Sequence, residues 1–149
     1  MDIFFLEVGN MDWTACRKNR LVKEVKKDKN LMDSLKKSAE KKMKSQEMLQ
    51  MSEDTAASKV SLMYDSLREL LEALAIKKGF KIYNHECYCA FLKEIMKESV
   101  MGDEFDKIRK IRNDINYYGK DISSEEAITI IKQIKELKHK IEEIMQTDI

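Results

Sequence analysis

The chain contains no proline and only four glycines in 149 residues, and this restricts its fold more than any other feature of the sequence. An all-β fold reverses direction every few residues, and its turns rely heavily on these two residue types. Charged residues make up 37% of the chain, above the usual share of about a quarter, which is typical of long solvated helices. We therefore predict an all-α fold. The length fits a single domain over residues 1–149 with a real core.

Positive charge is unevenly distributed, although the net charge is only +1. Residues 17–44 contain twelve Lys/Arg and four Asp/Glu, a local charge of +8. A basic region of this kind can attract phosphate backbones. The commoner explanation is a solvated helix face. The sequence leaves both interpretations open.

The cysteines indicate a reducing compartment. There are only three, and they are too few and too unevenly spaced for a disulfide framework (Cys16, Cys87 and Cys89). Ten methionines fit the same setting, so we expect a cytoplasmic protein.

The amino terminus does not read as a targeting segment. It lacks a basic leader and a small-residue cleavage site, and no segment of the chain approaches the length of a membrane span. We therefore expect no membrane association. Residues 1–11 are interpreted as a tail that docks Phe4, Phe5 and Leu6 on the core or on a partner.

Apolar residues at helical spacing, bounded by capping residues, predict six helices. These are a helix from Asp12 to about Lys27, a second from about Asn30 to Met51, a long third closed by Gly79, a fourth capped by Asn84, a fifth from Asp103 to Gly119, and a sixth opened by a Ser123–Glu126 capping box. Met101-Gly102-Asp103 is the expected turn before the fifth helix. Short connections force neighbouring helices to run antiparallel. We predict an up-and-down antiparallel bundle of four to five core helices plus an N-terminal helix, with a face left for a homodimer.

One segment, IRNDINYYGK at residues 111–120, differs from the Lys/Glu-rich surfaces elsewhere. At helical spacing its isoleucines face the core, and an arginine lies at the border of the exposed face beside asparagines and a tyrosine. A guanidinium suits phosphate oxygens, amides can bind a phosphate, ribose or base edge, and tyrosine can stack on a base. This pattern predicts an RNA- or nucleotide-binding surface formed by Arg109, Arg112, Asn113, Asn116 and Tyr117.

A structural role is the alternative for the same residues. Arg112 would then pair with Asp114 of a neighbouring subunit or with a glutamate of the last helix, and the asparagines would cap or bridge helices.

The segment also resembles the motif of the HEPN domain family, a nucleotide-binding helical bundle. The resemblance covers roughly residues 36–145. It rests on the helix order, on the long third helix (KVSLMYDSLRELLEALAIKKGFK), and on the IRNDINYYGK turn before a capped last helix. The family motif is an arginine, a polar residue that is usually asparagine, and a histidine separated from the arginine by four to six residues. Arg112 and Asn113 match its opening.

The chain departs from the motif at the histidine. The expected positions hold Tyr117, Tyr118 and Gly119, and the two histidines of the chain, His85 and His139, lie outside the motif. The resemblance implies a homodimer whose motif helices face each other across a cleft. Many members are metal-independent ribonucleases, in which the RNA 2′-hydroxyl attacks, the histidine moves protons and the arginine stabilises charge on the phosphate. Others are partners of minimal nucleotidyltransferases in toxin–antitoxin pairs.

Loss of the histidine favours binding over cleavage. Tyrosine titrates far above neutrality, and loss of a general base costs roughly a hundred- to ten-thousand-fold in rate. We therefore expect an RNA- or nucleotide-binding protein, and the resemblance implies a toxin–antitoxin pair with a minimal nucleotidyltransferase as its setting. The alternatives are an active metal-independent ribonuclease with Arg112 and Tyr117 as catalytic residues, or a purely structural interaction module.

A metal site is not expected. His85, Cys87 and Cys89 form an H-x-C-x-C run, but residues two apart on a helix point in nearly opposite directions and cannot converge on one ion. The sequence indicates no cofactor.

Overall fold

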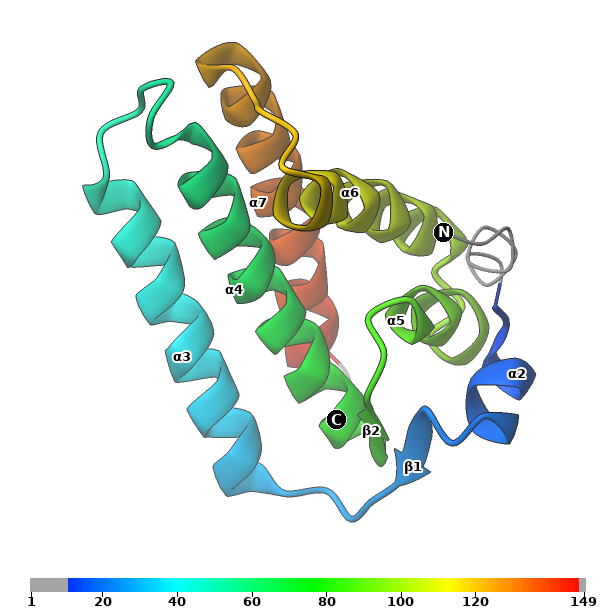
Figure 1. Cartoon of the computed structure of the whole chain (residues 1–149). Coiled ribbons are helices and arrows are strands. Elements are labelled where there is room, and N and C mark those ends of the chain that lie inside the picture. Colours follow the sequence, from blue (N-terminus) through cyan, green and yellow to red (C-terminus); the bar gives the residue numbers. More distant parts are fainter. Residues whose placement is uncertain (1–10, 148–149) are drawn as a thin grey trace.

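The computed structural model describes residues 11–147, and most of this chain is helical (Figure 1). The elements are α2 (Trp13–Lys18), β1 (Val22–Glu24), α3 (Lys29–Met48), α4 (Ala56–Lys77), β2 (Phe80–Ile82), α5 (Cys87–Ala90), the π-helix η1 (Phe91–Ile95), α6 (Ser99–Tyr118) and α7 (Ser124–Thr147). The predicted helical class is confirmed, with one small sheet added. Phe4, Phe5 and Leu6, which were predicted to dock on the core or on a partner, lie outside the described residues.

The central element is α4, which is buried along most of its circumference. Fourteen of its 22 residues are buried, as expected of a helix that is apolar on several faces. α3 packs along one side and α7 along another, while β2 and α6 also contact it. In Figure 1, α6 runs across the direction of α3, α4 and α7. A simple up-and-down bundle contains no such crossing helix.

Two lysines of α4 donate hydrogen bonds to carbonyl oxygens near the carboxyl ends of α3 and α7. Lys59 Nζ donates to the carbonyl oxygens of Gln46 and, at 2.6 Å, Leu49. Lys77 Nζ donates to the carbonyl oxygen of Met145 at 2.6 Å. A cation at a helix carboxyl end complements the helix dipole and satisfies free carbonyls. α4 therefore contacts α3 and α7 in two ways: its buried side chains pack against them, and its lysines bind carbonyl oxygens near their carboxyl ends.

Several predicted helix caps are confirmed. Asp12 Oδ1 accepts a hydrogen bond from an amide in the first turn of α2 at 2.8 Å. Gly79 follows α4 with a φ of 91°, and Gly119 ends α6 with a φ of 62°. Ser123 and Glu126 exchange side-chain to backbone hydrogen bonds of 3.1 Å at the start of α7.

The first helix is shorter than predicted, because the chain turns into a strand. α2 ends at Lys18, Arg20 takes a φ of 59°, and β1 pairs antiparallel with β2 in the register Val22↔Ile82. The predicted continuation of this helix to about Lys27 is wrong. A three-residue strand shows no clear alternation, and its hydrogen-bond partner lies far away in the sequence.

Gly102 lies inside α6 and not in a turn. The chain turns earlier, at Lys97 with a φ of 60°, and α6 starts at Ser99. A Cβ on Gly102 would lie 2.6 Å from Lys93 Cγ, so this glycine lets α6 approach η1 closely. The predicted turn at 101–103 and the predicted cap by Asp103 are therefore wrong. A glycine needed for close packing looks the same in sequence as one needed for a turn.

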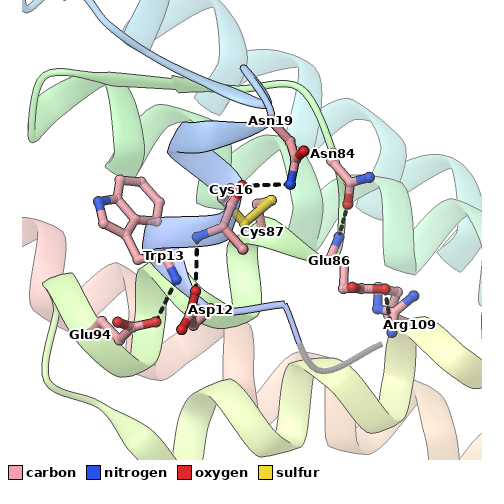
Figure 2. Close-up of a disulfide and its surroundings, with 10 residues drawn as sticks. Asp12, Trp13, Cys16, Asn19, Asn84, Glu86, Cys87, Glu94 and Arg109 are labelled. Atoms are coloured by element: carbon pink, nitrogen blue, oxygen red, sulfur yellow. Dashed lines mark hydrogen bonds and ion pairs between the residues drawn. A yellow bond between two sulfur atoms is a disulfide. The ribbon is translucent and has the colours of Figure 1, made fainter. Parts of the chain in front are cut away.

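Cys16 of α2 and Cys87 of α5 form a disulfide across 71 residues of sequence (Figure 2). Beside it, the Trp13 ring packs edge-on against Phe80 of β2, with ring centroids 5.1 Å apart. The Trp13 amide donates to Glu94 Oε2 at 2.7 Å. The amino-terminal segment is thus joined to the core covalently, by packing and by a helix-end hydrogen bond.

The disulfide corrects the interpretation of the cysteines. Disulfides are typical of oxidising compartments, so the cysteine content no longer supports a reducing one.

Among residues 11–147, no helix combines the length and the apolar character needed to cross a membrane. The cytoplasmic setting stays a prediction.

We expect loss of the disulfide to destabilise the fold substantially. Closing a loop of this length in the unfolded chain corresponds to roughly 4 kcal/mol in the chain-entropy model. The Cys16→Ser/Cys87→Ser variant should therefore unfold at a clearly lower denaturant concentration than the wild type. Cys89→Ala is the matched control, because Cys89 is the buried free cysteine. An unfolding midpoint that does not change when a reducing agent is added would contradict the pairing.

Candidate functional site

The candidate site is built on Tyr64, in the middle of α4. Its side chain is fully buried, and its ring stacks on Phe105 of α6 with the centroids 5.8 Å apart. Two turns further along α6, the guanidinium of Arg112 lies over the same Tyr64 ring, 5.1 Å from its centroid. The packing of α6 on Tyr64 therefore also decides where Arg112 lies.

Arg112 is held in place but its donors are not all used. Its side chain is 15% exposed, and Nη2 lies 3.8 Å from Asp65 Oδ1, beyond hydrogen-bond distance. The buried Nε has no hydrogen-bond partner in the described structure. The acidic neighbour is thus Asp65 of α4 and not a glutamate of the last helix. An arginine held mainly by an aromatic ring keeps donors for an incoming anion.

Two other predicted residues lie beside Arg112. The Tyr117 ring centroid is 5.9 Å from the Arg112 guanidinium carbon, and Tyr117 is 70% exposed. Asn116 Oδ1 accepts a hydrogen bond from Ser61 Oγ of α4 at 3.2 Å, the helix-bridging role weighed for the asparagines. Asn113 is half-buried, and its side chain makes no hydrogen bond within residues 11–147.

Arg109 lies apart from this group, on the side of α6 that faces α5. It is buried, with Nη2 2.7 Å from Asp106 Oδ1 and 3.7 Å from Glu86 Oε1. Burial opposes ionisation of Asp106, but the hydrogen bonds from Arg109 and Lys110 outweigh it and lower the pKa of that carboxyl. The structure therefore does not bring Arg109 to the exposed surface around Arg112.

His85, which lies outside the motif, is close to Tyr64 and Arg112. Its Nδ1 lies 3.0 Å from the Tyr64 hydroxyl oxygen, within hydrogen-bond distance. Burial and the positive charges of Arg68, Arg112 and Arg109 lower the pKa of His85 to about 4, so the imidazole is neutral at pH 7. Burial also raises the pKa of Tyr64, more than the nearby arginines lower it, so the phenol keeps its proton.

The turn that carries His85 is fixed on both sides. Asn84 Oδ1 accepts a hydrogen bond from the Glu86 amide at 2.8 Å, and Glu86 faces Arg109 (Figure 2). The N-cap residue of α5 is Glu86, so the predicted cap at Asn84 is wrong, and Asn84 stabilises the preceding turn instead. The next residue, Cys87, is tied to α2 by the disulfide. No sequence signal links this turn to Arg112, because only the packing of α5 and α6 on α4 brings the two together.

Arg68 completes the positive charge around His85. It lies one turn after Tyr64 on α4, and its Nη1 is 2.9 Å from Glu72 Oε1. Lys81 Nζ lies 3.5 Å from the other oxygen of Glu72. Arg68 and Arg109 thus have close carboxylate partners, whereas Arg112 has only the looser contact with Asp65. Arg112 is the arginine best placed to accept a new partner.

The H-x-C-x-C residues point to three different partners. His85 contacts Tyr64, Cys87 is in the disulfide, and Cys89 Sγ donates to Asp106 Oδ1 at 3.4 Å. Burial raises the pKa of Cys89 to about 12, so it stays a thiol at neutral pH. Among the described residues, no group of three or more potential metal ligands is arranged to hold an ion.

Two surface hollows lie away from Arg112. One lies between α3, α4 and α7 and is lined by Met51, Ile131 and Lys132, among others. The other lies beside α2 and α5 and is rich in carboxylates, including Glu94 and Asp103. Neither of these two hollows is lined by Arg112, Asn113, Asn116 or Tyr117.

Comparison with known proteins gives no match: no family model, no curated protein and no solved structure matches the chain. The HEPN resemblance therefore stays a prediction that rests on the helix order and on Arg112 and Asn113.

NMR should show that His85 takes up a proton only at an unusually low pH. We expect the His85 imidazole to stay neutral down to about pH 4 in the folded protein, against an ordinary pKa of 6.5. Because the folded pKa is the lower one, the unfolded chain takes up the proton first. Stability is therefore complete above about pH 6.5 and falls as the pH drops toward 4. A His85 midpoint near 6.5 would contradict the described environment.

Proposed function

We propose that the chain binds RNA or a nucleotide through the Arg112 surface, which we define as Arg112, Asn113, Asn116 and Tyr117. The observation that carries the proposal is the state of Arg112. Within the described part of the chain, its Nε is buried without a hydrogen-bond partner, and the one carboxylate paired with it lies 3.8 Å away. Because buried donors are normally satisfied, such a group favours an acceptor that arrives with a ligand.

A phosphate fits this surface better than a carboxylate side chain. It can approach Arg112 with two oxygens and replace the loose contact with Asp65 by charge-assisted hydrogen bonds. Tyr117, 70% exposed on the same surface, offers a ring on which a base can stack. Asn113 has an amide available for a base edge or a ribose hydroxyl, whereas Asn116 would first have to release Ser61.

The finer proposal is a HEPN-like protein that works as a homodimer and forms a toxin–antitoxin pair with a minimal nucleotidyltransferase. Its support is the motif match at Arg112 and Asn113 within a helical chain. The exposed rings of Tyr117 and Tyr118, 70% and 73% exposed, suit a surface that is covered by a second copy or a ligand.

A metal-independent ribonuclease is the second candidate, and one observation favours it. The chain lacks the motif histidine, yet His85 reaches the same region and touches Tyr64, on which Arg112 lies. A neutral imidazole near a bound phosphate can accept a proton, and general bases typically contribute a hundred- to ten-thousand-fold in rate. Tyr117 is the other candidate base from the sequence.

Replacement of Arg112 should weaken RNA binding. A hydrogen bond to a charged group contributes roughly 1.5–3 kcal/mol, so Arg112→Ala should raise the dissociation constant for a labelled oligoribonucleotide about 10- to 100-fold. Fluorescence anisotropy at fixed salt measures the change, and circular dichroism verifies that the variant is folded.

The matched control is Arg17→Ala, which removes the same charge from an exposed position on α2 in the basic amino-terminal region. If both variants lose affinity equally, binding is a general charge effect of that region and the Arg112 surface is not the site. If Arg112→Ala has no effect on RNA binding, the chain is better described as a structural interaction module. Cleavage of RNA by the wild type in the presence of a chelator, abolished in Arg112→Ala, would establish the ribonuclease.

A further inference from the structure

His85 is surrounded by charge from two helices. The Tyr64 hydroxyl of α4 is within hydrogen-bond distance of His85. The charges that act on its imidazole are those of Arg68 and Glu72 on α4 and of Arg109 and Arg112 on α6. Burial is the largest cause that opposes the charged imidazolium, and the three positive groups against one carboxylate oppose it further. The positive charge of Arg112 is therefore one part of what keeps His85 neutral, and the part that a ligand can change.

A bound phosphate would change this balance. It adds negative charge at Arg112, which lies over the ring whose hydroxyl contacts His85. An anion favours the protonated form of a nearby imidazole. The other arginines cannot supply the same change, because Arg68 and Arg109 already face Glu72 and Asp106 at 2.9 and 2.7 Å.

We propose that His85 is part of the Arg112 binding site and takes up a proton when a phosphodiester binds there, so that binding tightens as the pH falls. The inference rests on the proposed function, since it concerns the same surface. It adds to that surface a residue that the motif does not contain.

The size of the effect follows from simple electrostatics. A unit negative charge about 7 Å away, at an effective dielectric constant of about 20, raises an imidazole pKa by roughly 1–2 units. From about 4 in the free protein, the pKa of His85 would then rise to roughly 5–6 in the complex. Because the complex binds the proton more tightly than the free protein, affinity should rise roughly two- to tenfold between pH 7 and pH 5.

Calorimetry with a short oligouridylate tests the inference, because neither its phosphodiesters nor uracil titrates in this range. Titrations at about pH 5.5, in two buffers of different ionisation enthalpy, count the protons taken up on binding. We expect uptake of roughly 0.2–0.7 proton for the wild type, as the estimated rise of the His85 pKa implies. His85→Asn, which keeps an amide where Nδ1 contacts Tyr64, should abolish the uptake and flatten the pH dependence. His139→Asn should change neither.

Each result separates the inference from the function on which it rests. Binding by the wild type with the same proton uptake in His85→Asn would overturn the inference and assign the proton elsewhere, for instance to Glu86, whose pKa is raised by burial. Binding that depends on Arg112 but involves no proton uptake would also overturn it while leaving the proposed function intact. An absence of oligouridylate binding by the folded wild type across this pH range would reject both.

Discussion

Burial of α4 is the constraint on which the rest of the structure depends. An apolar helix with fourteen buried residues must be covered on several sides, and α3, α7, α6 and β2 provide the cover. The polar residues that α4 carries are placed by the same packing. Lys59 and Lys77 reach the carboxyl ends of neighbouring helices, and Ser66 donates to a carbonyl of α3 at 2.6 Å. Each buried polar group of this kind has a specific partner, which specifies how the neighbouring helices align.

Tyr64 connects the buried face of α4 to the candidate site. Its buried ring meets Phe105 and Arg112 of α6, and its hydroxyl meets His85 of the turn before α5. Three segments that are distant in sequence therefore share one aromatic side chain. The disulfide at Cys87, two residues from His85, fixes the third of these segments to the amino-terminal part of the chain. Arg112 is thus connected through Tyr64 and His85 to the turn that the disulfide holds.

Local signals in the sequence predicted local features well. The caps at Asp12, Gly119 and Ser123 depend on a few neighbouring residues, and the structure confirms them. The strand pair, the disulfide and the role of Gly102 depend on contacts between distant segments, which local sequence patterns do not reveal. Helical spacing placed Arg112 at the border of the buried face, where its side chain is 15% exposed. His85 was missed because its relation to Arg112 exists only after the chain has folded.

The central claim is that Arg112 has an unused capacity to bind phosphate. The most direct measurement follows the Nε–H signals of the arginine side chains by ¹⁵N NMR during titration with an oligoribonucleotide. The account predicts a large, saturable shift of the Arg112 signal, whose Nε has no partner in the free protein. The Arg109 signal, from an Nε that already donates to Asp106 at 3.2 Å, should move little. An Arg112 signal that stays unchanged when the ligand is saturating would contradict the account.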